Sequence, residues 1–171
     1  IDLPRDTNSQ IIKYNPLKRI PVLMLEDGAC VFDSPVITEY IDGMSGGNLI
    51  PNDVHERMIV KRWEAIVDGI MDAAVQVRME RERKIEQQDQ PLIDKNNNAI
   101  SLALRFINNE LETKEFCYKN QLTLADLALV SVMIYLDLRQ PERNWRKEYP
   151  HLNTWFEKVY QRESVQFSLA E

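Results

Sequence analysis

The sequence of 171 residues has few of the residue types that mark metal centres, disulfide frameworks and nucleotide-binding loops. Its two cysteines, Cys30 and Cys117, form neither a C-x-x-C pair nor part of a metal quartet. Its two histidines, His55 and His151, lack the partner of an H-x-x-H or H-E-x-x-H motif, which is typical of surface or capping histidines. The five glycines fit no dinucleotide fingerprint or P-loop, and no G-x-S-x-G elbow is present. We therefore predict two free thiols and no metal, nucleotide or serine hydrolase site.

Positive charge and long apolar runs are also scarce. The net charge is -6 and the pI is about 5.1, and no basic stripe is available to neutralise phosphates, which argues against nucleic acid. The densest charge run, residues 78–84, mixes both signs and is typical of a solvated helical face. No run reaches the roughly 20 apolar residues of a membrane span, and the first residues show no signal-peptide pattern. We expect a soluble, cytoplasmic protein with no membrane partner.

The first part of the chain predicts a short α/β unit. Residues 7–13 suggest a short, irregular helix, and residues 1–3 are compatible with the end of a strand. Residues 20–26 are apolar except at their end, as in a buried strand, and Asp27-Gly28 favours a type I′ hairpin turn into a second strand at 29–32.

A helix is expected directly after this hairpin. Ser34 and Pro35 have the pattern of an N-cap and a first helical residue, and helical spacing continues until Gly43. A proline at the head of a strand exposes the backbone of the preceding residue, and a helix N-terminus offers free N–H groups to an anion. The combination suits a small, peptide-like acid.

The remainder of the chain predicts helices only. Residues 45–53 are a linker, and a long helix with apolar residues at threes and fours follows from Val54. A second helix is expected after Asn96-Asn97-Asn98. Thr123 and Asp126 have the spacing of a capping box at the start of a helix over 124–136, and a last helix surrounds residues 152–159.

Several of these segments together resemble the glutathione S-transferase superfamily. Residues 15–25 read N-P-L-K-R-I-P-V-L-M-L and match N-P-L-x-[KR]-[IV]-P-x-L, and they are followed by the Asp-Gly hairpin and by Asp33-Ser34 before a helix. The likeness extends through residues 65–73 and 122–126 and is greatest for the small bacterial glutathione transferase-like proteins with Asp-Ser at the second motif.

The resemblance implies a fold of the class α/β plus all-α. It places a thioredoxin-like, glutathione-binding domain at 1–44, a linker at 45–53 and an all-helical domain at 54–171. In the family, a strand and a helix precede everything seen here, and their junction carries the residue that activates the glutathione thiol. We therefore expect about one βα unit to be missing before residue 1, and no catalytic residue is assigned.

The resemblance also implies binding residues. Ile20, before the candidate cis proline Pro21, would pair its main chain with the cysteinyl part of glutathione like an added strand. Asp33 and Ser34 match the pair that binds the γ-glutamyl end, Asp33 attracting the ammonium group and Ser34 the α-carboxylate. Arg19 stands where the family often has lysine and is a candidate for the glycyl carboxylate. The plainer alternatives are a trans proline entering a strand and a simple helix cap.

The function implied is conjugation of glutathione to a small electrophile by a homodimeric transferase of detoxification, with glutathione as cosubstrate and no metal. Two alternatives stay open: a glutathione-dependent disulfide reductase and a non-catalytic binding or scaffold protein. Asp68 and Asp72 share a helix face, but like charges so spaced usually face solvent or a subunit partner. Cys30 lies near the proposed site, where a structural thiol is favoured over a redox one.

Overall fold

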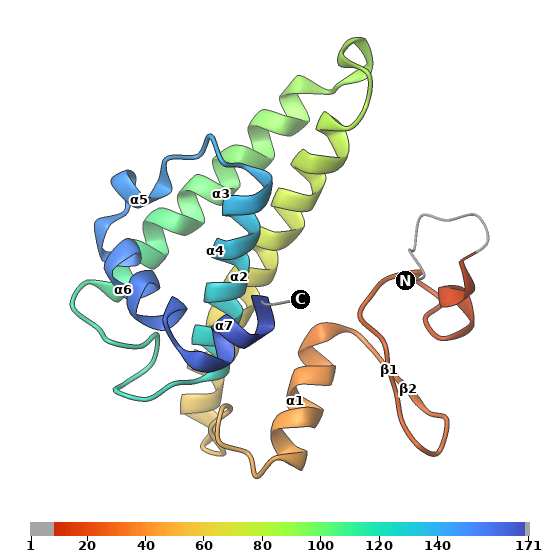
Figure 1. Ribbon diagram of the computed structural model, residues 1–171, viewed down its shortest axis with the longest axis vertical. Coiled ribbons are helices and arrows are strands. Elements are labelled where there is room, and N and C mark those ends of the chain that lie inside the picture. The colour runs from red at the N-terminus through yellow and green to blue at the C-terminus, as the bar shows by residue number, and fades with distance from the viewer. Residues whose placement is uncertain (1–8, 170–171) are drawn as a thin grey trace. The chain divides into compact units, whose positions relative to one another are not determined.

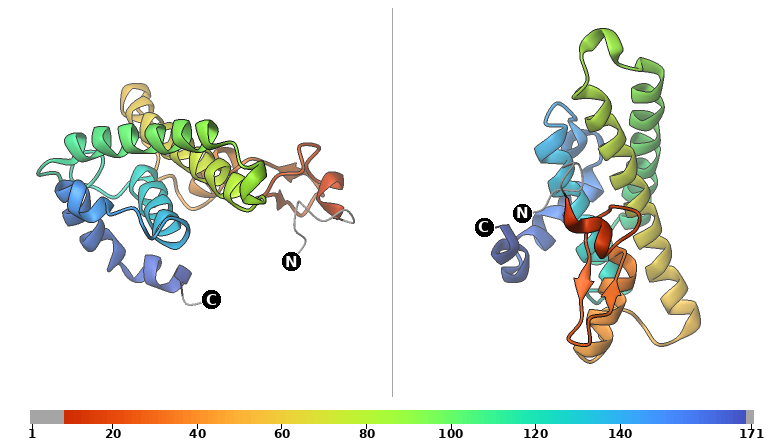
Figure 2. Two further views of the ribbon diagram at one scale, coloured as in Figure 1. Left: turned by 90° about the horizontal axis from the view of Figure 1, so that it is seen from above. Right: turned by 90° about the vertical axis from the view of Figure 1, so that its right-hand side faces the viewer.

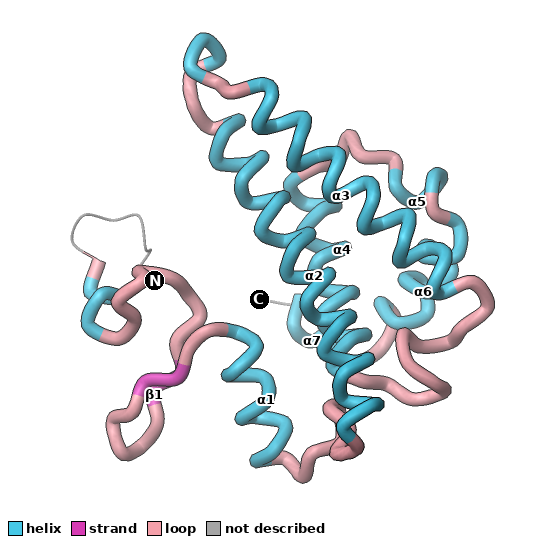
Figure 3. Tube along the Cα trace, turned by 180° about the vertical axis from the view of Figure 1, so that it is seen from behind, coloured by secondary structure: helices cyan, strands magenta, loops and turns pink. Residues whose placement is uncertain are grey.

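The computed structural model describes residues 9–169, and the chain forms two compact units, Ile1–Asn52 and Asp53–Glu171. The strand end expected at residues 1–3 and the start of the helix expected at residue 7 lie outside the described residues. In the first unit, a 3-10 helix (Gln10–Lys13) precedes β1 (Leu23–Met24), β2 (Cys30–Val31) and α1 (Ser34–Met44) (Figures 1 and 3).

The helices of the second unit follow in chain order, and the longest connection, residues 112–123, lies between α3 and α4 (Figure 1). They are α2 (Val54–Arg81), α3 (Gln90–Leu111), α4 (Leu124–Arg139), α5 (Trp145–Glu148), α6 (Pro150–Tyr160) and α7 (Glu163–Leu169), with a 3-10 turn at Ile85–Gln87 between α2 and α3. None of the helices in residues 9–169 combines the length and apolar composition needed to cross a membrane.

The two strands form a shorter hairpin than the sequence predicts. They are antiparallel, with Leu23 opposite Val31 and Met24 opposite Cys30. The predicted type I′ turn is wrong, because that turn needs positive φ at both central residues and only Gly28 has it, at 84°. The Gly28 N–H instead donates to the Leu25 carbonyl at 3.0 Å, which closes a longer loop. Toward the other end the ladder stops because Pro21 has no N–H to donate.

Helix α1 differs from the prediction at both ends. Its N-cap is Asp33 rather than Ser34, because Asp33 keeps an extended backbone while its carbonyl accepts the N–H of Ile37 at 3.0 Å. Gly43 lies within the helix, which ends one residue later and is followed by Gly46 and Gly47, both with positive φ. An open helical position tolerates Gly43, whereas the turn after the helix requires the left-handed region.

Helices α2 and α3 run antiparallel and side by side for most of their lengths (Figures 1 and 2). Asp53 caps α2 by accepting the N–H groups of His55 and Glu56 at 3.0 Å each. The prediction that α3 follows the three asparagines is wrong. The helix begins at Gln90, where the carboxylate of Asp89 accepts the Leu92 N–H and Pro91 occupies the first turn.

The core of the second unit lies where α4 packs against α2 and where α6 packs against α3 and α4. All three tryptophans are buried in it, together with large aliphatic side chains at Ile70, Ile100, Leu104, Leu129 and Leu136. The capping box expected at Thr123 and Asp126 is present, and both residues are fully buried. Helix α4 extends beyond the prediction to Arg139, and the short helices α5 and α7 are not predicted. Helix α7 carries a single buried residue, Val165, which leaves little periodicity to detect.

Candidate functional site

The segment before β1 is held in shape by one buried amide side chain. Asn15 is 1% exposed, and its Nδ2 donates to the Arg19 carbonyl at 2.9 Å while its Oδ1 accepts the Leu17 N–H at 2.9 Å. These bonds close the turn in which Lys18 adopts a positive φ of 52°. Asn15 therefore fixes the chain that leads into Ile20. The motif contains Asn15 but does not by itself predict this role; an asparagine before a proline at a turn is the available signal.

Ile20 and Pro21 occupy the approach to β1. The peptide bond between them is cis, as expected from the motif. Ile20 is 56% exposed, and no hydrogen bond from residues 9–169 engages its backbone N–H or C=O. An exposed residue with both backbone groups unpaired next to a strand is a site where an extended peptide can add hydrogen bonds.

The start of α1 presents a second set of donors. Ser34 is the first helical residue, so its N–H has no partner within the helix, and its hydroxyl makes no hydrogen bond within the described part of the chain. The Asp33 carboxylate also makes no side-chain capping bond, and both residues are exposed. The helix end therefore offers an N–H and a hydroxyl to an anion, next to a carboxylate suited to a cation.

The hairpin register brings these two sets of groups to the same end of the first unit. Leu23 lies opposite Val31, so Ile20, which precedes Leu23, and Ser34, which follows Val31, both lie toward the open end of the hairpin, beyond the paired residues. Arg19 is exposed and immediately precedes Ile20 in the chain. Residues far apart in the motif thus lie toward the same end of the hairpin.

Comparison with known proteins identifies the family. Residues 1–44 match the family model described as Glutathione S-transferase, N-terminal domain, and residues 66–163 match the Glutathione S-transferase, C-terminal domain. A GST-like protein of Escherichia coli K12, YibF, which is described as uncharacterized, is 32% identical over 164 residues, covering 95% of this chain and 81% of YibF.

The chain belongs to the glutathione S-transferase superfamily.

Solved structures of the superfamily share this fold. A glutathione S-transferase from Methylobacillus flagellatus, solved with GSH bound, superposes with a TM-score of 0.91 at 36% identity, covering 95% of this chain and 81% of the other. A family member from Pseudomonas fluorescens Pf-5, solved with glutathione bound, gives a TM-score of 0.85 at 34% identity over 91% of this chain and 76% of the other. The predicted fold class, a thioredoxin-like domain followed by an all-helical domain, is confirmed.

The remaining candidate residues of this superfamily member do not gather into a second centre of chemistry. Cys30 is half-buried on β2, and its thiol points back to the Gly28 carbonyl, with Sγ and O 3.8 Å apart. Asp68 and Asp72 lie on α2, in the other unit. Among residues 9–169, no three His, Cys, Asp or Glu side chains come together in a way that could hold a metal ion.

Proposed function

We propose that this superfamily member binds reduced glutathione through its first unit and transfers the glutathione thiolate to a small electrophile. The observation that carries the proposal is that the Ile20 backbone and the Ser34 donors, which have no hydrogen-bond partner among residues 9–169, both lie toward the open end of the hairpin. The two related structures solved with glutathione bound support the choice of ligand.

Each part of glutathione has a chemically suitable partner in this arrangement. The cysteinyl main chain pairs with the N–H and C=O of Ile20 as an added strand. The γ-glutamyl α-carboxylate accepts the N–H and hydroxyl of Ser34 at the positive end of α1, and its ammonium group faces the Asp33 carboxylate. The glycyl carboxylate is assigned to Arg19, whose guanidinium suits a carboxylate.

The proposed reaction is a nucleophilic substitution at carbon in which the glutathione sulfur is the nucleophile. The glutathione thiol loses its proton, the thiolate forms a C–S bond with the electrophilic carbon, and the leaving group departs with its electron pair. The residues named above hold glutathione in place; none of them is assigned to lower the pKa of the thiol.

Calorimetry with the full-length protein tests the binding step. Reduced glutathione is expected to bind, and Ser34→Ala is expected to weaken binding by about 1 to 3 kcal/mol through loss of a charge-assisted hydrogen bond. Ser164→Ala removes an exposed serine hydroxyl from the other unit and serves as the matched control, with unchanged affinity expected. Absence of heat at millimolar glutathione would refute the proposal.

Turnover assays separate the three functions compatible with binding. Release of chloride from 1-chloro-2,4-dinitrobenzene supports conjugation, and reduction of a small disulfide without conjugation supports the reductase. Glutathione binding with neither activity supports a binding or scaffold protein. With conjugation we further propose a twofold homodimer, the commonest symmetric assembly, acting in the cytoplasm in detoxification of electrophiles.

A further inference from the structure

One buried carboxylate ties the end of α1 to the chain that follows it. Asp42 is 6% exposed, and its Oδ1 accepts the N–H of Asn48 at 3.1 Å and that of Leu49 at 2.9 Å. Its Oδ2 accepts the N–H of Ile50 at 3.0 Å. The backbone carbonyl of Asp42 also accepts the Gly47 N–H at 2.7 Å. The side chain and the backbone of this residue therefore both hold the returning chain against the last turn of α1.

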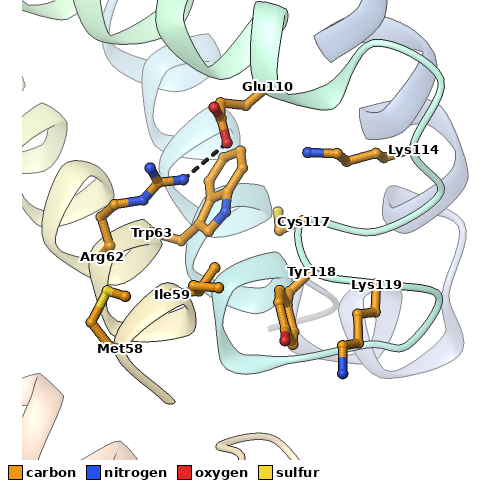
Figure 4. Close-up of a pocket in the computed structure, with 9 residues that line it drawn as sticks. All are labelled: Met58, Ile59, Arg62, Trp63, Glu110, Lys114, Cys117, Tyr118 and Lys119. Atoms are coloured by element: carbon orange, nitrogen blue, oxygen red, sulfur yellow. Dashed lines mark hydrogen bonds and ion pairs between the residues drawn. The ribbon is translucent and has the colours of Figure 1, made fainter. Parts of the chain in front are cut away.

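This anchor differs from the ion pairs that join other elements of the chain. The pair between Arg62 of α2 and Glu110 of α3 is an example (Figure 4), and its side chains are 50% and 33% exposed. Such pairs contribute little, because solvent screens the charges. Asp42 is buried, and removing its carboxylate would leave the buried N–H of Ile50 and two neighbouring N–H groups without their acceptor. The Asp42 contact is therefore the stronger of the two kinds.

Helix α1 has few other contacts that fix its position within residues 9–169. Only Ile37 and Asp42 are buried among the residues of this helix. Its other apolar side chains include Val36, Ile41 and Met44, each of which is more than half exposed. Packing of an apolar face supplies most of the stability of an ordinary helix in a folded protein. Because α1 buries so little, its position depends on the Asp42 carboxylate more than that of a well-packed helix would.

The opposite end of α1 carries groups that we assign to glutathione. Ser34 is the first residue of the helix, and Asp42 lies about 12 Å further along the helix axis, at 1.5 Å per residue. The hydrogen bonds within the helix make it move as one piece, so a change of tilt at Asp42 displaces the N–H and the hydroxyl of Ser34. Binding groups must be held within about 0.5 Å of the productive geometry. Loss of the anchor at one end is therefore expected to impair binding at the other.

We infer that Asp42 is a positioning residue for glutathione binding and that bound glutathione stabilises the ordered conformation of residues 48–50. The inference rests on the proposed function, since it needs glutathione at Ser34. Glutathione engages Ser34 when α1 is in place, and the Asp42 carboxylate holds residues 48–50 when α1 is in place. The two events share one helix, so each favours the other by the same factor.

Amide hydrogen exchange of the full-length protein, with and without saturating reduced glutathione, tests this coupling. In the parent, glutathione is expected to slow exchange of the amides of residues 48–50 by about fivefold or more. Asp42→Asn replaces one acceptor oxygen by an NH₂ group. It should speed exchange at these amides, abolish their protection by glutathione and weaken glutathione binding about tenfold by calorimetry. Glu26→Gln, which changes an exposed carboxylate of the same unit, is the matched control and should behave as the parent does.

The amide of Leu129, which is buried in the second unit, reports general unfolding. It should exchange at the same rate in the parent and in Asp42→Asn. Equal acceleration at Leu129 and at residues 48–50 would show a general structural role for Asp42 and would overturn the inference. Glutathione binding by the parent without slower exchange at residues 48–50, or parent-like affinity in Asp42→Asn, would overturn the coupling alone. Absence of binding by the parent would overturn the proposed function and the coupling with it.

Discussion

Replacing Asp126 with alanine is expected to destabilise the protein far more than an ordinary loss of a helix cap. The buried carboxylate accepts four hydrogen bonds: from the backbone N–H of Thr123 at 2.9 Å, the Thr123 hydroxyl at 3.0 Å, the Cys117 N–H at 2.8 Å and the Trp155 indole N–H at 3.3 Å. It therefore joins the loop before α4, the first turn of α4 and helix α6 at one point.

The magnitude follows from the donors that remain. Asp126→Ala leaves three buried N–H groups without their acceptor, and each unsatisfied group costs about 1 to 3 kcal/mol. Allowing for local relaxation, we expect a loss of about 3 to 5 kcal/mol in the free energy of unfolding. Thr123→Val keeps the shape of the side chain and removes only the hydroxyl donor, so about 1 kcal/mol is expected. The double variant should lose less than the sum, because both changes disrupt the same group.

Urea denaturation of the parent, the two single variants and the double variant measures these quantities. Asp72→Ala removes an exposed carboxylate from α2 and is the matched control, with a change within about 0.5 kcal/mol. Glutathione affinity should be the same in all of them, since the changes lie in the other unit. A loss below about 1 kcal/mol for Asp126→Ala, or strictly additive losses, would contradict the role given to this carboxylate.

Three further outcomes are expected. Burial raises the pKa of the Cys117 thiol well above its ordinary value, and the nearby charge of Asp126 adds to this effect. The folded protein therefore keeps a thiol proton that the unfolded chain loses above about pH 8.5. As a result, the free energy of unfolding should fall with rising pH in this range by up to about 1.4 kcal/mol per pH unit. Denaturation at neutral and alkaline pH should show this slope in the parent and its absence in Cys117→Ala, and equal slopes would disprove it. Asn15→Ala leaves the Leu17 N–H and the Arg19 carbonyl without their bonds, so we expect a loss of about 1 to 3 kcal/mol in stability and weaker glutathione binding by calorimetry; parent-like affinity would exclude a positioning role. Light scattering should give twice the protomer mass, and a folded monomer at tens of micromolar would argue against the dimer.

The parts of the fold that the sequence predicts are those encoded locally. The capping box at Thr123 and Asp126 needs only the identity and spacing of two residues, and it is present. Apolar periodicity likewise predicts α2, whose buried positions recur at threes and fours. The start of α3 is missed because its early turns bury a single residue, Ile93, and contain asparagines that suggest a loop.

The spatial arrangement of the site residues is harder to predict than their identity. The sequence pattern identifies Ile20 and Ser34, but only the register shows that they share one end of the hairpin. The shift of the N-cap from Ser34 to Asp33 depends on backbone angles that serine and aspartate accept equally well at this position.

Binding of glutathione at the hairpin end is tested most directly by following the backbone amide signals of the isotopically labelled protein by NMR while reduced glutathione is added. The amides of Ile20 and Ser34 are predicted to move together along one saturable curve, and Ser34→Ala should shift that curve to higher glutathione concentration. Saturable movement confined to other residues, or no movement of Ile20 and Ser34 at millimolar glutathione, would show that the hairpin end is not where this protein holds glutathione.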